Sequence, residues 1–173
     1  VVPSAPGKRF SEDIKVTDML YDCYRAAESG KDFSKKLQKI QARYQEIISG
    51  LKLELSLDEE FELIARNFKE QAGEDYAASR GEYLNGIVMA NYLDMEFIDA
   101  AEVIFFDENG NFDEAKTDKC LSERLEGVEF AVIPGFYGKR ADGVINTFSR
   151  GGSDITGSIV AKACKADLYE NWT

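Results

Sequence analysis

The chain has 173 residues, 44% of them hydrophobic, which suits one domain with a substantial core. Its formal charge of −11 at pH 7 argues against a nucleic acid or an anionic membrane surface as the main partner. Histidine is absent, so Ser-His-Asp and Cys-His catalysis and H-E-x-x-H metal sites are excluded. No apolar run approaches about 18 residues, and the N-terminal segment carries no signal-peptide pattern, so we expect a cytoplasmic protein with no membrane partner.

The first half of the chain predicts the end of a strand followed by helices. Val1–Gly7 is typical of a buried strand that runs into a turn, because its prolines and its glycine cannot continue a β-ladder. Apolar residues then recur at helical spacing, which predicts helices over 14–27, 32–51, 56–73 and 76–93. The second and third helices form a predicted helical hairpin within 32–72, which either packs on the rest of the domain or contributes to a dimer.

The second half of the chain is typical of an α/β fold. Residues 101–106 and 128–133 are short and almost entirely apolar, as in strands that are covered on both faces. A helix predicted over 117–125 would connect them as a crossover, which implies a largely parallel sheet. The remaining predicted elements are a hairpin turn at Asp142-Gly143, a helix over 153–165 and a last strand over 167–173.

The run Phe148–Thr156 carries a signal for anion binding. Two glycines in this run precede a predicted helix, so backbone amides and the positive end of the helix dipole point outward at one turn. Arg150 adds a forked cation that suits a carboxylate or a phosphate. The same run also fits an ordinary helix cap made by Ser153 and Asp154, so both interpretations stay open.

Three further residues have both a functional and a structural interpretation. Ser4 follows the predicted first strand, where open α/β sheets bind ligands, but it also fits an ordinary turn. Glu82, on an otherwise apolar helix, is either a buried acceptor for an ammonium group or a solvated carboxylate. Phe136, after a core strand, either shapes the floor of a pocket or packs in the core. The chain has no P-loop motif and no protein-kinase catalytic loop.

Six short motifs follow one another in a characteristic order. They are Ser-Ala-Pro-Gly after a strand, Thr-Asp on a helix, Arg-Gly-Glu, Gly-Phe, Arg-Gly-Gly-Ser-Asp and Glu-Asn-Trp-Thr. This order resembles the aspartate kinases of the amino-acid kinase family over nearly the whole chain. The Arg-Gly-Gly-Ser-Asp-x-Thr run followed by Trp-Thr is specific to that branch.

The resemblance implies a fold and an activity. The fold is a three-layer α/β sandwich with a mainly parallel central sheet, into which the helical hairpin is inserted. The activity is transfer of the γ-phosphoryl group of ATP to the side-chain carboxylate of L-aspartate, giving 4-phospho-L-aspartate in the first step of lysine, threonine and methionine biosynthesis. The expected ligands are L-aspartate, ATP and Mg²⁺, with no metal ligand assigned in this chain. A homo-oligomer is expected for the full-length enzyme.

The resemblance also implies the residues of the site. The substrate-binding positions are Ser4, Thr17, Glu82, Phe136, Arg150 and Ser153. In this assignment, Arg150 takes the α-carboxylate of aspartate and Glu82 takes its α-ammonium group. Asp154 is the implied catalytic residue, which organises the phosphate region. Gly151, Gly152 and Thr173 are the implied phosphate and nucleotide contacts.

Two parts of the family pattern have no counterpart in this sequence. A Lys-Phe-Gly-Gly strand is expected before Val1, and an Asp-x-x-Gly segment is expected after Thr173. We therefore expect 1–173 to be a single, incomplete catalytic domain that is inactive by itself. Two alternatives stay open, namely a non-catalytic fragment and another amino-acid kinase with a different acceptor. The Arg-Gly-Glu and Arg-Gly-Gly-Ser-Asp motifs favour aspartate.

Overall fold

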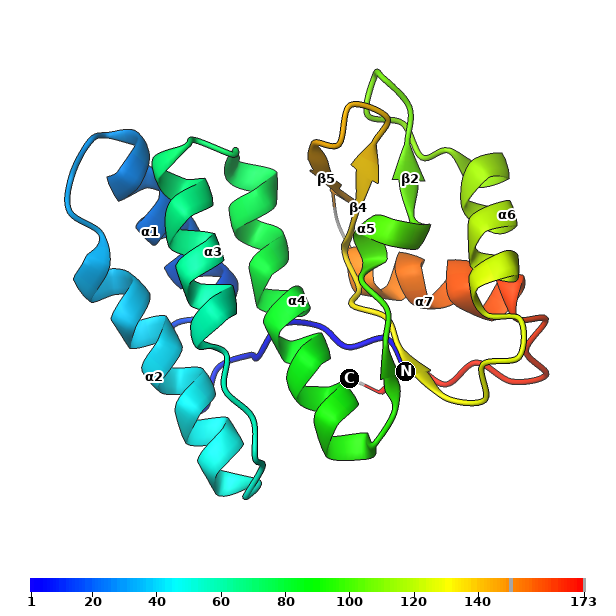
Figure 1. Cartoon of the computed structure of the whole chain (residues 1–173), viewed down its shortest axis with the longest axis horizontal. Helices are drawn as coiled ribbons and strands as arrows, with labels where there is room; N and C mark the ends of the chain where they lie inside the picture. The colour runs from blue at the N-terminus through cyan, green and yellow to red at the C-terminus, as the bar shows by residue number, and fades with distance from the viewer. Residues whose placement is uncertain (150, 173) are drawn as a thin grey trace.

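Four helices form one side of the molecule in the computed structural model, which describes residues 1–149 and 151–172 (Figure 1). They confirm the four helices predicted for the first half of the chain. Their bounds are α1 Val16–Glu28, α2 Ser34–Gly50, α3 Asp58–Lys69 and α4 Glu74–Leu93.

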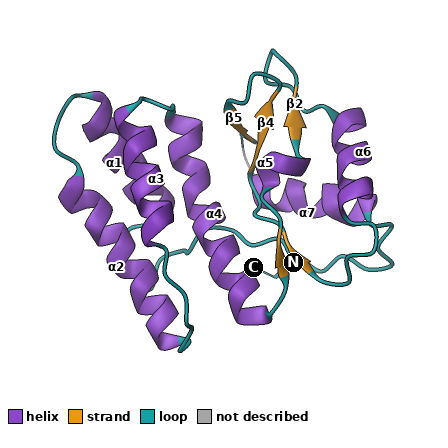
Figure 2. Cartoon of the chain, viewed as in Figure 1, coloured by secondary structure: helices purple, strands orange, loops and turns teal. Residues whose placement is uncertain are grey.

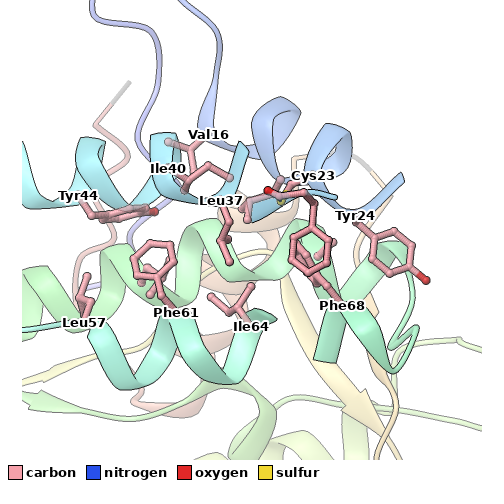
Figure 3. Close-up of a cluster of buried hydrophobic side chains, with 14 of the residues drawn as sticks. Val16, Cys23, Tyr24, Leu37, Ile40, Tyr44, Leu57, Phe61, Ile64 and Phe68 are labelled. Carbon is pink, nitrogen blue, oxygen red and sulfur yellow. The ribbon is translucent and has the colours of Figure 1, made fainter. Parts of the chain in front are cut away.

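The predicted helical hairpin is present as α2 and α3. Both helices pack against α1, and α3 also contacts α4, so the hairpin lies on the rest of the chain. Its apolar faces meet in one cluster of buried side chains, several of which are shown in Figure 3. Phe68 is fully buried at an aromatic centre of this cluster, with its ring centroid 5.5 Å from that of Tyr24 and 6.0 Å from that of Phe33.

Short strands and three helices form the other side of the molecule (Figure 2). Helices α6 and α7 lie on the opposite side of the strands from α1–α3 (Figure 1). The bounds are β1 Glu96–Phe97, α5 Ala100–Val103, β2 Phe105–Phe106, α6 Glu114–Arg124, β3 Ala131–Val132, β4 Tyr137–Arg140, β5 Ile145–Thr147 and α7 Gly152–Ala163.

The strands pair mostly in parallel. β1 pairs with β3 and β2 with β4 in parallel, whereas β4 and β5 form the antiparallel hairpin predicted at Asp142-Gly143. Val1–Pro3 continues the first pair without being a named strand. The carbonyls of Val1 and Pro3 accept hydrogen bonds from the amides of Ile133 (2.9 Å) and Gly135 (3.0 Å). The strands thus form two small sheets, β1-β3 and β2-β4-β5, and their mainly parallel pairing between helices confirms the predicted α/β fold class.

The structure contradicts two predicted strands. The first half of the run 101–106 forms the helical turn α5, because the carboxylate of Asp99 accepts a hydrogen bond from the amide of Ala101 at 2.9 Å and caps it. Only Phe105–Phe106 is a strand there. The segment 167–172 forms no strand.

Within the described residues, no helix combines the length and the apolar character needed to cross a lipid bilayer.

The aromatic centre of the helical cluster gives a test of the fold. We expect Phe68→Ala to lower the free energy of unfolding by about 3–5 kcal/mol, because a large buried ring is removed and its neighbours fill the space only in part. Phe10→Ala is the matched control and should change stability little, since Phe10 is 57% exposed. Urea denaturation of both variants gives the comparison, and equal effects would contradict the packing described here.

Candidate functional site

A cavity of about 860 Å³ lies between the N-terminal segment 1–4, α4, α7 and the C-terminal segment 166–172. Ser4, Ser153 and Asp154 line it, so the structure brings together three of the residues predicted from the sequence. Their elements explain this arrangement, because Ser4 follows the segment that pairs with β3, and the other two lie in the first turn of α7. The cavity is therefore at the carboxyl ends of parallel strands and at the start of a helix.

The first turn of α7 is shaped by backbone geometry and not by a side-chain cap. Its N-cap is Gly151, which has φ 58°, and no side chain caps the helix. The first hydrogen bond within the helix runs from the amide of Ile155 to the carbonyl of Gly151 (2.9 Å). The amides of the residues before Ile155 belong to the helix start, which precedes this first bond. Ser153 and Asp154 therefore do not serve as ordinary caps, which leaves their side chains available at the cavity.

Two glycines allow this turn to approach the end of the core strand closely. A Cβ on Gly135 would lie 2.7 Å from the Cα of Ser153, and a Cβ on Gly152 would lie 2.5 Å from the ring of Phe136. Both distances are shorter than any stable contact between carbon atoms. The glycines are thus needed to pack the helix start against the residues that follow β3.

Phe136 holds an unusual backbone conformation at this junction. Its φ is 81°, in the left-handed region that side-chain-bearing residues rarely adopt. The amide of Phe136 donates a hydrogen bond to the hydroxyl of Thr156 at 3.1 Å. The carbonyl of Phe136 accepts a hydrogen bond from the amide of Phe148 at 2.9 Å. Strained backbone held by surrounding contacts is common at functional sites. Phe136 packs against Gly152 and is not among the described residues that line the cavity, so its pocket role stays a prediction.

The side chain of Glu82 on α4 is buried, so the interpretation of Glu82 as a solvated carboxylate is wrong. Its side chain is 6% exposed, and Oε2 has no hydrogen-bond partner among the described residues. Burial raises the pKa of Glu82 from 4.5 to about 7, although the backbone amide of Ala5 lowers it in part. A buried carboxylate with an unsatisfied oxygen is suited to receive a cation, such as an ammonium group.

Ser4 and Asp154 each have a neighbouring amide side chain that the sequence analysis did not identify. Asn85 donates to the carbonyl of Ser4 at 2.6 Å, and Asn171 donates to the carboxylate of Asp154 at 3.0 Å. Both asparagines line the cavity. Asn85 could have been found from its position one turn after Glu82 on the same helix.

The other predicted residues are less closely joined to the cavity. Thr17 lies half-buried in the first turn of α1 and is not among the described residues that line the cavity. Arg150 and Thr173 lie outside the described residues. Across residues 1–149 and 151–172, no group of three or more Cys, Asp or Glu side chains could hold a metal ion, and the chain has no histidine.

A mainly parallel sheet between helical layers, with polar groups gathered where strands end and a helix begins, is the arrangement of α/β proteins that bind anionic ligands. The chain belongs to the amino acid kinase family, whose model matches residues 1–173.

The similar proteins are aspartate kinases. Aspartokinase 3 of Bacillus subtilis is 37% identical over 191 residues, which cover 100% of this chain and 41% of that protein. The crystal structure of the aspartate kinase of Clostridium acetobutylicum superposes with a TM-score of 0.96 at 51% identity, over 99% of this chain and 40% of that one. E. coli aspartokinase III, in complex with aspartate and ADP, shares the fold with a TM-score of 0.75 at 24% identity, over 96% of this chain and 40% of that one. The chain thus spans about 40% of the length of these relatives.

The burial of Glu82 predicts a pH-dependent stability. The folded pKa of Glu82 is above its unfolded value, so its contribution to stability is complete below pH 4.5 and is lost as the pH rises through about 7. The loss amounts to about 3 kcal/mol. We expect Glu82→Gln to remove this fall, so the variant should be more stable than the parent chain at pH 8. Urea denaturation between pH 4.5 and pH 8 checks this.

The control for this measurement is Glu62→Gln, which changes an exposed carboxylate on α3. It should keep the pH dependence of the parent chain. An unchanged pH profile in Glu82→Gln would show that Glu82 is solvated in solution.

The close packing at Gly135 gives a second prediction for the site. Gly135→Ala should lower the free energy of unfolding by about 1–3 kcal/mol, because the new methyl group meets the backbone of Ser153. Gly50→Ala is the matched control, since a Cβ there has open space within a helix, and it should stabilise the chain by about 0.5–1 kcal/mol. Thermal unfolding of both variants separates the two signs, and a stable Gly135→Ala would contradict the tight junction.

Proposed function

We propose that this chain is part of the catalytic domain of an aspartate kinase, which phosphorylates the side-chain carboxylate of L-aspartate with ATP to give 4-phospho-L-aspartate. The buried carboxylate of Glu82 supports this proposal most directly. It lies beside Ala5, one residue from Ser4 at the cavity, and offers an unsatisfied oxygen that suits an α-ammonium group. The similarity to aspartate kinases of two other species agrees with this substrate.

Each proposed binding residue contacts a different part of the amino acid. Glu82 accepts the α-ammonium group, and Arg150, whose role is inferred from the sequence alone, pairs with the α-carboxylate. Ser4, Thr17 and Ser153 add neutral hydrogen bonds, while Phe136 bounds the pocket. Together these groups select an amino acid that carries both an α-ammonium group and an α-carboxylate. An uncharged analogue would leave Glu82 and Arg150 without partners.

The reaction needs alignment and charge neutralisation more than proton transfer. The side-chain carboxylate of aspartate is already ionised near pH 7, so it requires no general base to attack a phosphorus atom. Amides at the start of α7, including those of Gly151 and Gly152, are proposed to bind the phosphate oxygens. Asp154, held by Asn171 at 3.0 Å, would orient the phosphate region, and Thr173 is proposed to contact the nucleotide.

Mg²⁺ fits this site as an ion carried mainly by the phosphates of ATP. The described residues hold no acidic cluster that could bind the ion without a nucleotide. Mg²⁺ is usually bound through one or two carboxylates and substrate phosphates, so the single carboxylate of Asp154 is sufficient. When bound, the ion would neutralise charge on the transferred phosphoryl group. Assembly into a homo-oligomer and a cytoplasmic location are further parts of the proposal for the whole enzyme.

The proposal is tested in a longer polypeptide that contains this chain and is as long as the aspartate kinases it resembles. Formation of an acyl phosphate is detected as the hydroxamate, with L-aspartate, L-glutamate and N-acetyl-L-glutamate as separate acceptors. We expect turnover with L-aspartate only. Turnover with another acceptor would support the alternative of a different amino-acid kinase, and none at all would support a non-catalytic role. The 173-residue chain by itself should show no turnover.

The same assay tests the role of Glu82. Glu82→Gln should lower kcat/KM for aspartate about thirtyfold or more, because removing one partner of a buried charged pair costs about 2 kcal/mol at least. Glu62→Gln on the exposed face of α3 should leave kcat/KM within about twofold. An unchanged kcat/KM in Glu82→Gln would remove Glu82 from the substrate site.

A further inference from the structure

The loop between Ser4 and Thr17 is held by a side chain from outside it. Arg43 on α2 is 4% exposed, and its guanidinium group donates to the carbonyl of Ile14 at 2.6 Å and to the carbonyl of Gly7. These two carbonyls lie at opposite ends of the loop 7–14. A single forked cation therefore joins the point where the chain leaves Ser4 to the point where it reaches α1.

An acidic residue inside the loop completes this contact. Asp13 lies 3.2 Å from the guanidinium group of Arg43, and it also accepts hydrogen bonds from the side chain (2.9 Å) and the amide (3.0 Å) of Arg9. The hydrogen bonds from Arg9, with a smaller effect of Arg43, hold the pKa of Asp13 well below its usual range. The carboxylate thus stays ionised at physiological pH, which keeps the buried charge of Arg43 paired.

The residue next to Arg43 contacts the helix that carries Glu82. Tyr44 is fully buried in the helical cluster, and its hydroxyl donates to the carbonyl of Gly81 at 2.7 Å (Figure 3). Gly81 directly precedes Glu82, and a Cβ on Gly81 would lie 2.8 Å from that of Ala5. Two adjacent residues of α2 therefore hold the loop on one side and the helix that carries Glu82 on the other.

We propose that Arg43 is a positioning residue for the aspartate site, which holds the loop 7–14 so that Ser4 and Thr17 face the amino acid with Glu82. Arg43 itself does not touch the substrate. It acts through the loop and through Asp13. The helical hairpin then has a role in substrate binding, because α2 supplies this residue. The inference rests on the function proposed above.

The role predicts a specific change in kinetics. In the polypeptide of the relatives' length, Arg43→Met should raise KM for aspartate about tenfold to a hundredfold, because groups displaced by about 1 Å bind their ligand in poor geometry. The KM for ATP should change by less than about threefold, since the start of α7 is not held by Arg43. Hydrogen exchange should become faster in residues 7–14 and stay unchanged in α6.

Two further variants sharpen the test. Arg43→Lys keeps the charge but loses the fork, so its KM for aspartate should lie between those of the parent and Arg43→Met. If Arg43→Met does not fold, Arg43→Lys carries the test. The matched control is Arg25→Met, which removes an arginine from an exposed ion pair with Glu74 (3.1 Å) and should change neither KM.

The outcomes separate this inference from the proposed function. Absence of turnover with aspartate in the parent polypeptide would contradict the proposed function, while hydrogen exchange in residues 7–14 of the Arg43 variants would still test the hold on the loop. Turnover in the parent with an unchanged KM for aspartate in Arg43→Lys and Arg43→Met would overturn the positioning role. A loss of thermal stability alone, with KM unchanged, would likewise show that Arg43 serves stability only.

Discussion

Helix α4 is buried or half-buried from Tyr76 to Ala90, and the rest of the structure depends on this burial. It packs against α1 and α3 on one side and against β1, β3 and β5 on the other. Two of its glycines make this possible, because a Cβ on Gly81 would meet Ala5 and a Cβ on Gly86 would lie 2.7 Å from Pro134. The close approach brings the N-terminal segment and the residues after β3 to the same helix. The cavity at Ser4 and Ser153 forms where these segments meet.

The buried part of α4 includes polar side chains. Arg80 is 5% exposed, and its guanidinium group lies over the rings of Tyr76, Tyr83 and Tyr137 at 4.7, 4.3 and 5.2 Å from their centroids. Aromatic faces can stabilise a desolvated cation by about 2 kcal/mol. Because Tyr137 belongs to β4, the same contact fixes α4 against the sheet. Glu82, two residues away, lacks such a full set of partners, because its Oε2 has no hydrogen-bond partner among the described residues.

The sequence predicted most of the helices because their apolar residues recur at helical spacing, and α4 was predicted in the same way although it is buried over most of its length. It did not predict the strands as well. The run 101–106 is apolar throughout, and such a run fits a buried helix as well as a strand, so the capping contact of Asp99 with Ala101 decided its start. The motif order predicted Glu82 as a site residue, but it did not reveal the contact of its carboxylate with the backbone amide of Ala5, which is distant in the sequence. Arg43 was missed because nothing in the sequence of an amphipathic helix reveals that one of its cations contacts a loop.

The glycines before α7 show how one residue type can satisfy packing and chemistry together. From the sequence, Gly151 and Gly152 indicate a flexible turn with accessible amides. In the structure, a Cβ at Gly152 would clash with the ring of Phe136 and lie 3.1 Å from the Cβ of Phe148, so the residue is required by packing before any ligand is considered. That packing also keeps Phe136 at a φ of 81° and holds the first turn of α7 beside the end of the core strand. The amides are therefore fixed in place by the aromatic core, and a phosphate that bound them would find its donors already ordered.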